Sequence, residues 1–398
     1  MRVTNANAFD RSLDTLQQRQ QSLVEAQDRL TSGKRIARAS DDPTGAARVE
    51  RALAQEARAD ASQRALEASR NAMVQAESAL GQAGDLMQRA RELIVQAGNP
   101  TYDDVQRRSL AQEIRGLREQ LVQVANRGDG AGGWLFSGQG SAQPPFVDAP
   151  GGVQFSGTQG TLLTASGEPL PMSSDGEQVF LRSASGNGVF VTEPGPGNGN
   201  QAWINAGHVT DPVSVTGDAY SLLFSDTGSG TTYAVLRNGL PTAMTAEPYV
   251  AGQAIQFDGL SMTVNGAPGH GDLFEIEPAA RDLSIFDALD RVVAGLQTAN
   301  PSKAQITQAV QTGLRDLDAA TANVTAERAR LGEVLNRTDA VEDRIATSKL
   351  LAQTERSAAE DLDMVQAVSD FSARQTSYDA ALKAYSMVQK LSLFEYIR

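Results

Sequence analysis

Apolar side chains recur at alternating steps of three and four residues near both ends of the chain. The N-terminal series is Phe9, Leu13, Leu16, Leu23 and Leu30, and the C-terminal series is Met364, Val368, Phe371, Tyr378, Leu382, Tyr385, Leu391 and Phe394. This heptad spacing predicts two helices that pair as a coiled coil. Glutamines interrupt both apolar faces, so the pair alone buries too little to offset the entropy of ordering it. We therefore expect the two helices to be flexible in the free monomer and stable against other subunits. An ordinary antiparallel coiled coil within one molecule is the alternative.

A second pattern follows the first helix and combines a row of large residues with a row of small ones. The large row is Leu66, Met73, Leu80, Met87 and Ile94, and the small row is Ser69, Ala76, Ala83, Ala90 and Ala97. These rows predict a long helix, ending near Ala97, that a partner helix can approach closely. Capping oxygens at Ser40, Asp41 and Asp42 precede Pro43, which suits a first helical turn.

Further helices are expected on both sides of the middle of the chain. Asn99-Pro100 ends the long helix, and a third one begins near Asp103 or Asp104. After the middle, residues 285–296 predict a short helix that Asn300-Pro301 terminates. The next helix carries a long apolar row: Val310, Leu314, Leu317, Val324, Leu331 and Leu335.

The middle of the chain differs in composition from both flanks. Residues 128–277 hold 27 of the 36 glycines, 11 of the 15 prolines, both tryptophans and both histidines. They also hold 14 acidic residues but only two basic ones, so this block has a net charge of −12 against −13 for the whole chain. Short alternating segments between glycines predict β-structure.

The expected fold class is therefore α+β and multidomain, with long terminal helices in a helical bundle and a central, mainly β insertion. We expect terminal coiled-coil helices at 1–38 and 358–398, a helical body at 39–132 and 280–357, and a β-rich insertion at 133–279.

Residues 23–47, LVEAQDRLTSGKRIARASDDPTGAA, resemble the N-terminal signature of bacterial flagellins and their axial relatives. Two further segments are similar to the branch of this family found at the hook-filament junction. They are GWLFSGQGSAQPPF at residues 133–146 and QKLSLFEYI at residues 389–397. Flagellins, in contrast, typically end in a Leu-Leu-Arg type of sequence.

The resemblance implies a structural subunit that joins hook to filament and is needed for motility. Its terminal helices would form an inner tube, and the insertion would face solvent. The implied partners are further copies in a ring-like homo-oligomer, axial proteins on the hook and filament sides, and an export chaperone. The resemblance also implies an extracellular protein. Residues 1–10 lack the apolar run of a secretory signal peptide, so we expect export through the flagellar type III channel.

Composition argues against most enzymatic chemistry. Without cysteine there is no thiolate nucleophile or ligand, and two histidines, His208 and His270, cannot form a tris-imidazole site. A pI near 4.8 disfavours nucleic acid, and no apolar run is long enough to span a membrane. We expect no catalytic residue, no metal and no cofactor.

Several weaker hypotheses stay open at the level of sequence. GPGNGN at residues 195–200 is expected to be a surface turn, because no helix with a Lys-Ser or Lys-Thr pair follows as in a phosphate loop. His270 is expected to be a solvated loop histidine, and a cation site with Asp272 and Glu275 is the weaker alternative. The alternatives in function are flagellin itself, an adhesin that binds through the β insertion, and a carboxylate hydrolase carried on a filament scaffold.

Overall fold

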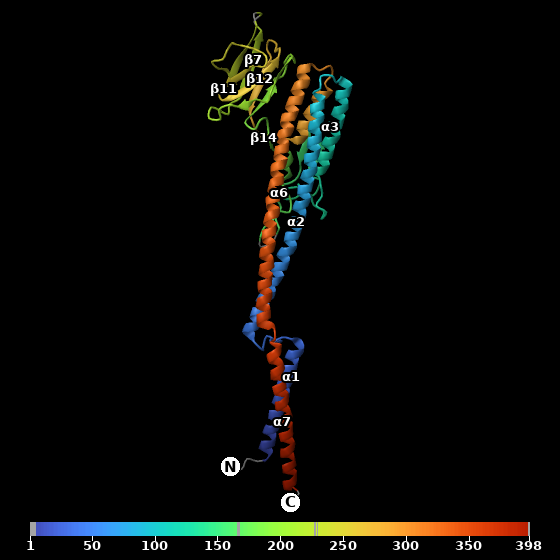
Figure 1. Cartoon of the computed structure of the whole chain (residues 1–398), viewed down its shortest axis with the longest axis vertical. Coiled ribbons are helices and arrows are strands. Elements are labelled where there is room, and N and C mark those ends of the chain that lie inside the picture. Colours follow the sequence, from blue (N-terminus) through green and yellow to red (C-terminus); the bar gives the residue numbers. More distant parts are fainter. Residues whose placement is uncertain (1–4, 165–167, 227, 229, 397–398) are drawn as a thin grey trace. The chain divides into compact units, whose positions relative to one another are not determined.

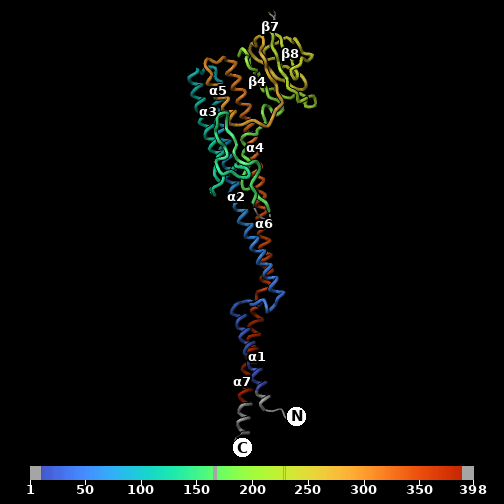
Figure 2. The backbone as a smooth tube through the Cα atoms, turned by 180° about the vertical axis from the view of Figure 1, so that it is seen from behind, coloured from blue at the N-terminus to red at the C-terminus, as the bar shows by residue number. Residues whose placement is uncertain are grey.

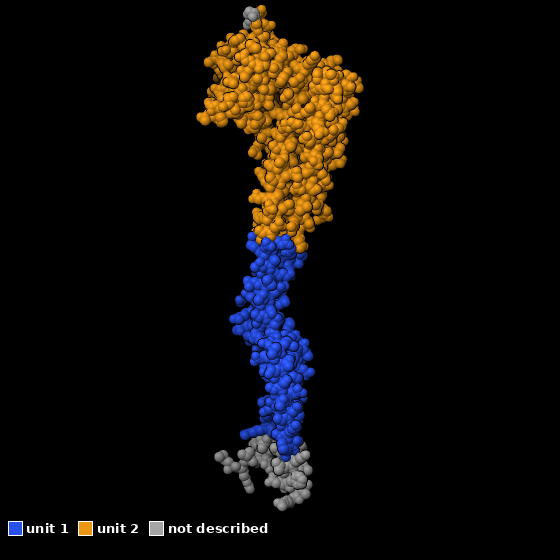
Figure 3. All heavy atoms as spheres, viewed as in Figure 1, with its two compact units in different colours: residues 1–64, 341–398 blue, residues 65–340 orange. Residues whose placement is uncertain are grey.

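The computed structural model describes residues 5–164, 168–226, 228 and 230–396 (Figure 1). The chain forms two compact units, Met1–Arg64 with Val341–Arg398 and Ala65–Ala340 (Figure 3). The long helices are α1 (Asn5–Ser32), α2 (Pro43–Ala97), α3 (Asp104–Ala125), α6 (Lys303–Glu360) and α7 (Met364–Tyr396). A shorter helix, α5, spans Ile285–Gln297. Long terminal helices around a central antiparallel β region confirm the predicted fold class.

Helices α1 and α7 pair within the first unit, side by side in both backbone views (Figures 1 and 2). The guanidinium of Arg19 donates to the carbonyl oxygen of Ser377 at 3.0 Å, and Arg374 donates to that of Ser22 at 3.4 Å. Moving forward along α1 thus corresponds to moving backward along α7. The two helices are antiparallel.

Helices α2 and α6 are also antiparallel, and ion pairs connect them at intervals. In the first unit, the Lys349 ammonium lies 2.6 Å from the Asp60 carboxylate. In the second unit, Arg328 lies 2.6 Å from Glu77, and Arg91 lies 2.9 Å from Asp318. Such pairs individually stabilise little, but their spacing favours one register between two helices of 55 and 58 residues.

The core of the helical body contains both rows predicted for α2. Leu66, Met73, Leu80, Met87 and Ile94 are at most 1% exposed, and Ser69, Ala76, Ala83, Ala90 and Ala97 are 0% exposed. The predicted helix ends are confirmed as well. Asp103 caps α3 by accepting the Gln106 N–H at 2.8 Å, and Asp42 caps α2 by accepting the Gly45 N–H at 2.9 Å.

The segment after α3 packs onto the helical body rather than onto the rest of the β-structure. It contains the hairpin β1 (Phe146–Ala149) and β2 (Gly152–Phe155), the short α4 (Gly176–Phe180) and β3 (Ser183–Ala184). The Phe180 ring lies 5.3 Å from that of Phe136, 5.4 Å from that of Phe146 and 6.1 Å from that of Phe286 in α5. The change in composition at residue 133 therefore does not coincide with the start of a separate β core.

A second hydrophobic core lies between two antiparallel sheets built from residues 190–278, which we call the outer β domain. The first sheet comprises β4 (Phe190–Pro194), β7 (Tyr220–Asp226), β8 (Thr231–Arg237), β9 (Leu240–Pro241), β10 (Glu247–Pro248) and β13 (Leu273–Pro278). The second sheet comprises β5 (Ala202–Ile204), β6 (His208–Val209), β11 (Ala254–Phe257) and β12 (Leu260–Gly266). The strand order is β10-β8-β7-β13-β4 in the first sheet, with β9 on β8, and β11-β12-β5 in the second, with β6 on β12. A last strand, β14 (Arg281–Leu283), pairs with β3.

Candidate functional site

The apolar residues predicted as assembly positions fall into two groups on the α1/α7 pair. Half-buried side chains form the first group: Leu16, Leu23, Leu30, Phe371, Tyr378 and Tyr385. The second group is exposed to solvent: Leu13 is 40% exposed, Met364 and Val368 are 50%, and Leu382 is 41%. The side chains of Phe9, Leu391 and Phe394 lie outside the described part of the chain.

Three further exposed apolar residues on these helices were missed by the heptad analysis. Val24 is 49% exposed, Val365 is 85% and Met387 is 60%. They lie off the predicted seam, so periodicity alone could not find them. Together with Leu13, Met364, Val368 and Leu382 they form what we call the terminal apolar surface. The rows of α2 differ from this surface, because all their members are at most 1% exposed.

Both connections between the terminal helices and the longer helices meet at one joint. The Arg35 N–H donates to the carbonyl oxygen of Glu360 at 2.7 Å, and the Leu362 N–H donates to that of Gly33 at 3.0 Å. Lys34 forms an ion pair with Glu360. Lys34 and Arg35, two of the basic residues between α1 and α2, thus bind the end of α6 within the same chain.

The cap of α2 lies at the same joint and is electrostatically favourable. The hydrogen bond from the Gly45 N–H, followed by that from the Thr44 hydroxyl, lowers the pKa of Asp42 below its usual value. A Cβ on Gly45 would lie 2.4 Å from the Ile36 side chain, which is buried. Only glycine leaves room there for Ile36 to pack against the start of α2.

The glycine-rich segment at residues 195–200 is a turn organised by the outer β domain. The buried Asp272 carboxylate accepts the Gly199 N–H at 2.6 Å and the Gly269 N–H at 2.8 Å. Asn198 adds hydrogen bonds to both backbone groups of Leu273. Both oxygens of the Asp272 carboxylate thus hold the backbone of the turn.

The other residues considered as metal ligands do not form a site in the described part of the chain. His208 and His270 are both exposed. In the part of the chain that the structure describes, no three His, Asp or Glu side chains come together in a way that could hold a metal ion. Within the same residues, none of the helices combines the length and the apolar character needed to cross a bilayer.

Comparisons with known proteins match three parts of this chain. Residues 4–141 match the bacterial flagellin N-terminal helical region, and residues 314–397 match the bacterial flagellin C-terminal helical region. These two models together match more than half of the chain. Residues 196–278, a segment of the outer β domain, match the D2-like domain of flagellar hook-associated protein 1.

Individual relatives resemble the chain over most of its length. Flagellar hook-associated protein 3 of Escherichia coli K12 is 25% identical over 400 residues, covering 99% of each chain. The same protein of Salmonella typhimurium is 25% identical over 189 residues, covering 48% of this chain and 59% of its own.

Solved structures give the same result. Hook-associated protein 3 of Legionella pneumophila is 27% identical, with a TM-score of 0.70 over 77% of this chain and 96% of its own. The FlgL structure of Xanthomonas campestris is 27% identical, with a TM-score of 0.69 over 78% of this chain and 99% of its own.

Proposed function

Because the chain belongs to the bacterial flagellin family, in its hook-associated protein 3 branch, we propose that its terminal apolar surface builds it into the hook-filament junction. The protein is a structural subunit of the bacterial flagellum at this junction, outside the cell, and it is not an enzyme. The proposal concerns how the subunit is held there.

The exposure of apolar residues on α1 and α7 is the observation that supports this mechanism. Fully burying a valine or leucine side chain contributes about 1.5–3 kcal/mol. Val368 and Val365, 50% and 85% exposed, receive only part of that stabilisation within the monomer. Neighbouring helix pairs in a tube would bury these side chains, so assembly would stabilise the pair by mass action.

The remaining parts of the chain have complementary roles in this proposal. The subunits form a ring-like homo-oligomer, with other axial proteins on the hook side and the filament side. The helical body contacts its lateral neighbours, and the insertion faces solvent. An export chaperone covers the terminal helices before secretion through the flagellar type III channel, because exposed apolar faces are prone to aggregate.

Substitutions on the terminal apolar surface test the assembly mechanism directly. Val368→Asp and Leu382→Asp place charges where neighbours would otherwise bury apolar atoms. We expect both variants to keep the monomer's thermal midpoint and to fail in restoring filaments to cells that lack the protein, as seen by electron microscopy. The matched control is Val213→Asp, because Val213 is 93% exposed but lies in the outer β domain.

The control variant should restore filaments on the hooks. Normal filaments with Val368→Asp and Leu382→Asp would contradict the proposal. A large drop in the monomer's thermal midpoint would also contradict it, because the two helices would then belong to an intramolecular core.

A further inference from the structure

The unit formed by residues 65–340 contains two hydrophobic cores, and they share no residue among those the structure describes. The core of the outer β domain runs from Phe190 to Ile276 and includes Phe224 and Phe274, both fully buried. The core of the helical body resumes at Ile285. Among the described residues, no apolar cluster therefore joins the outer β domain to the helices.

The chain enters and leaves the outer β domain through a narrow neck, residues 184–189 and 279–283. The Ser185 N–H donates to the carbonyl oxygen of Ala280 at 2.9 Å, and the Ala279 N–H donates to that of Val189 at 2.9 Å. Gly186 and Gly188 in the neck have φ angles of +62° and +88°. The turn that contains these two left-handed glycines, beside the short β3/β14 pair, forms a connection that can absorb backbone rotation.

Side chains on one face of α6 hold the backbone of the outer β domain beside this neck. Gln308 accepts the Ile204 N–H at 2.9 Å through Oε1, and Arg315 donates to the carbonyl oxygen of Thr192 at 2.8 Å. Gln308 and Arg315 are seven residues apart, so they lie on the same face of the helix. Ser302, near the start of α6, donates to the carbonyl oxygen of Asn200.

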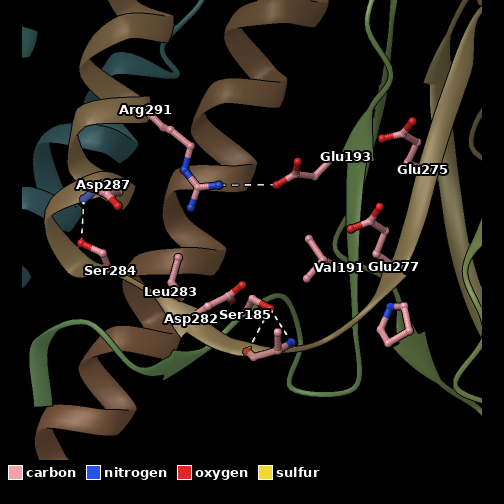
Figure 4. Close-up of a pocket in the computed structure, with 12 residues that line it drawn as sticks. Ser185, Val191, Glu193, Glu275, Glu277, Asp282, Leu283, Ser284, Asp287 and Arg291 are labelled. Carbon is pink, nitrogen blue, oxygen red and sulfur yellow. Dashed lines mark hydrogen bonds and ion pairs between the residues drawn. The ribbon is translucent and has the colours of Figure 1, made fainter. Parts of the chain in front are cut away.

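Charged groups reinforce these hydrogen bonds. Arg291 of α5 points toward Glu193 of β4, and the closest atoms are 3.5 Å apart (Figure 4). Arg315 lies 3.8 Å from the same carboxylate. The buried Asp316 accepts hydrogen bonds from both arginines at 2.8 Å, which orients the two guanidinium groups. We call Glu193, Arg291, Gln308, Arg315 and Ser302 the latch.

Cavities flank the latch on several sides. One of about 420 Å³ lies between β4, β13 and α5, and Figure 4 shows the Glu275 and Glu277 side chains at its wall. A second, of about 350 Å³, lies between β4, β5 and the α5/α6 pair. A third, of about 560 Å³, lies between the neck and α6. Among the described residues, the contact is thus made by the polar groups of the latch, which lie beside open cavities.

We propose that the outer β domain is a hinged arm, with its hinge at the neck, and that the latch holds it against α6. Releasing the latch exchanges protein hydrogen bonds for hydrogen bonds with water and leaves both hydrophobic cores intact. Interfaces of this polar kind permit domain motion, whereas large apolar ones prevent it. The arm can therefore leave α6 under load or on contact with a neighbour without unfolding either core.

Distance measurements between two spin labels test the hinge in the full chain. The natural sequence has no cysteine, so Thr245→Cys in the outer β domain and Ala326→Cys in α6, both at exposed positions, give a unique label pair. Pulsed electron paramagnetic resonance should find one narrow distance distribution in the otherwise unchanged chain. Arg315→Met should add a second population at a different distance, because it removes the bonds to Thr192 and Glu193.

The matched control is Arg328→Met, which removes the ion pair with Glu77 inside the helical body and touches no residue of the outer β domain. It should keep the single narrow distribution. An unchanged distribution in Arg315→Met, or equal broadening in the control, would overturn the proposal.

A second latch variant protects the test against simple misfolding, because Arg315 is largely buried. Glu193 is 47% exposed in its side chain, so Glu193→Gln removes the ion pairs without emptying a core. If Arg315→Met lowers the circular dichroism signal, which indicates misfolding, the distance distribution of Glu193→Gln is the test of the latch. A second distance population in that variant supports the latch, and a distribution identical to that of the unchanged chain refutes it.

Discussion

The hydroxyl of Ser69 donates a 2.6 Å hydrogen bond to the carbonyl oxygen of Pro171, 102 residues further along the chain. Ser69 belongs to the small row of α2 and is fully buried. The bond therefore connects the interior of the helical body to the loop before α4. The row of small residues on α2 thus has one polar member, Ser69, whose specific hydrogen-bond partner is Pro171.

Ser69→Ala should lower the free energy of unfolding by about 1–3 kcal/mol, because the Pro171 carbonyl would remain buried without a donor. Thermal and denaturant unfolding of the full chain measure the change. Ser109→Ala is the control, since the Ser109 hydroxyl is exposed and bonds only within its own helix. Equal effects from the two substitutions would show that the bond to Pro171 contributes nothing.

Ala83→Arg should destabilise the helical body strongly. Ala83 is 0% exposed, so the substitution both overfills the packing and buries an unpaired charge, at a cost of about 2–5 kcal/mol. Gly84→Ala is the matched control, because a Cβ there meets no atom within 4 Å. It should raise stability by about 0.5–1 kcal/mol through helix propensity. A thermal midpoint that stays constant in Ala83→Arg would mean that this face is not packed.

Asp148 should make stability depend on pH in the acidic range. The guanidinium of Arg118 donates to Asp148 at 2.9 Å and lowers the pKa of that carboxyl. A carboxyl with a lowered pKa stabilises the fold above its unfolded pKa, near 4, and loses this effect as the pH falls through the lower folded value. Asp148→Asn should thus reduce the thermal midpoint at pH 7 and matter little below pH 3. A difference that persists unchanged at low pH would contradict the assignment.

Asp287 should show the opposite dependence. Burial, followed by repulsion from Asp290, raises the pKa of Asp287, so its ionised form opposes folding at neutral pH. A carboxyl with a raised pKa favours the fold below its unfolded pKa, and that advantage is lost as the pH rises through the folded value. Asp287→Asn should raise the thermal midpoint at pH 7, with the gain disappearing below about pH 4. A loss of stability at pH 7 would show that the charge is favourable.

The outer β domain should fold without the helices. A fragment of residues 187–280 contains all the buried members of the second core, so it should give a β-type circular dichroism spectrum and unfold cooperatively. A longer fragment of residues 133–280 should gain no stability, because Phe146 and Phe180 would lose Phe286 as their partner. A random-coil spectrum for the shorter fragment would contradict the division into two cores.

Much of the helical architecture could be predicted from the sequence because its determinants are local. The burial of Met73, Leu80 and Met87 follows from their seven-residue spacing on one helix. The end of α2 at Ala97 and the cap of α3 at Asp103 follow from the residues next to them. The glycine-rich composition of the middle, together with its short alternating segments, indicated β-structure.

The division of that middle segment was decided only by tertiary contacts. Nothing in the alternation of residues 133–184 distinguishes them from residues 190–278, yet Phe146 and Phe180 pack against Phe286, more than one hundred residues away. The same is true of the latch, where Arg315 and Thr192 are 123 residues apart. Which faces of the helices are apolar follows from the order of residues, because periodicity is a property of neighbouring positions. Which of these faces find a partner inside the chain, and which remain exposed, depends on contacts between segments far apart in sequence.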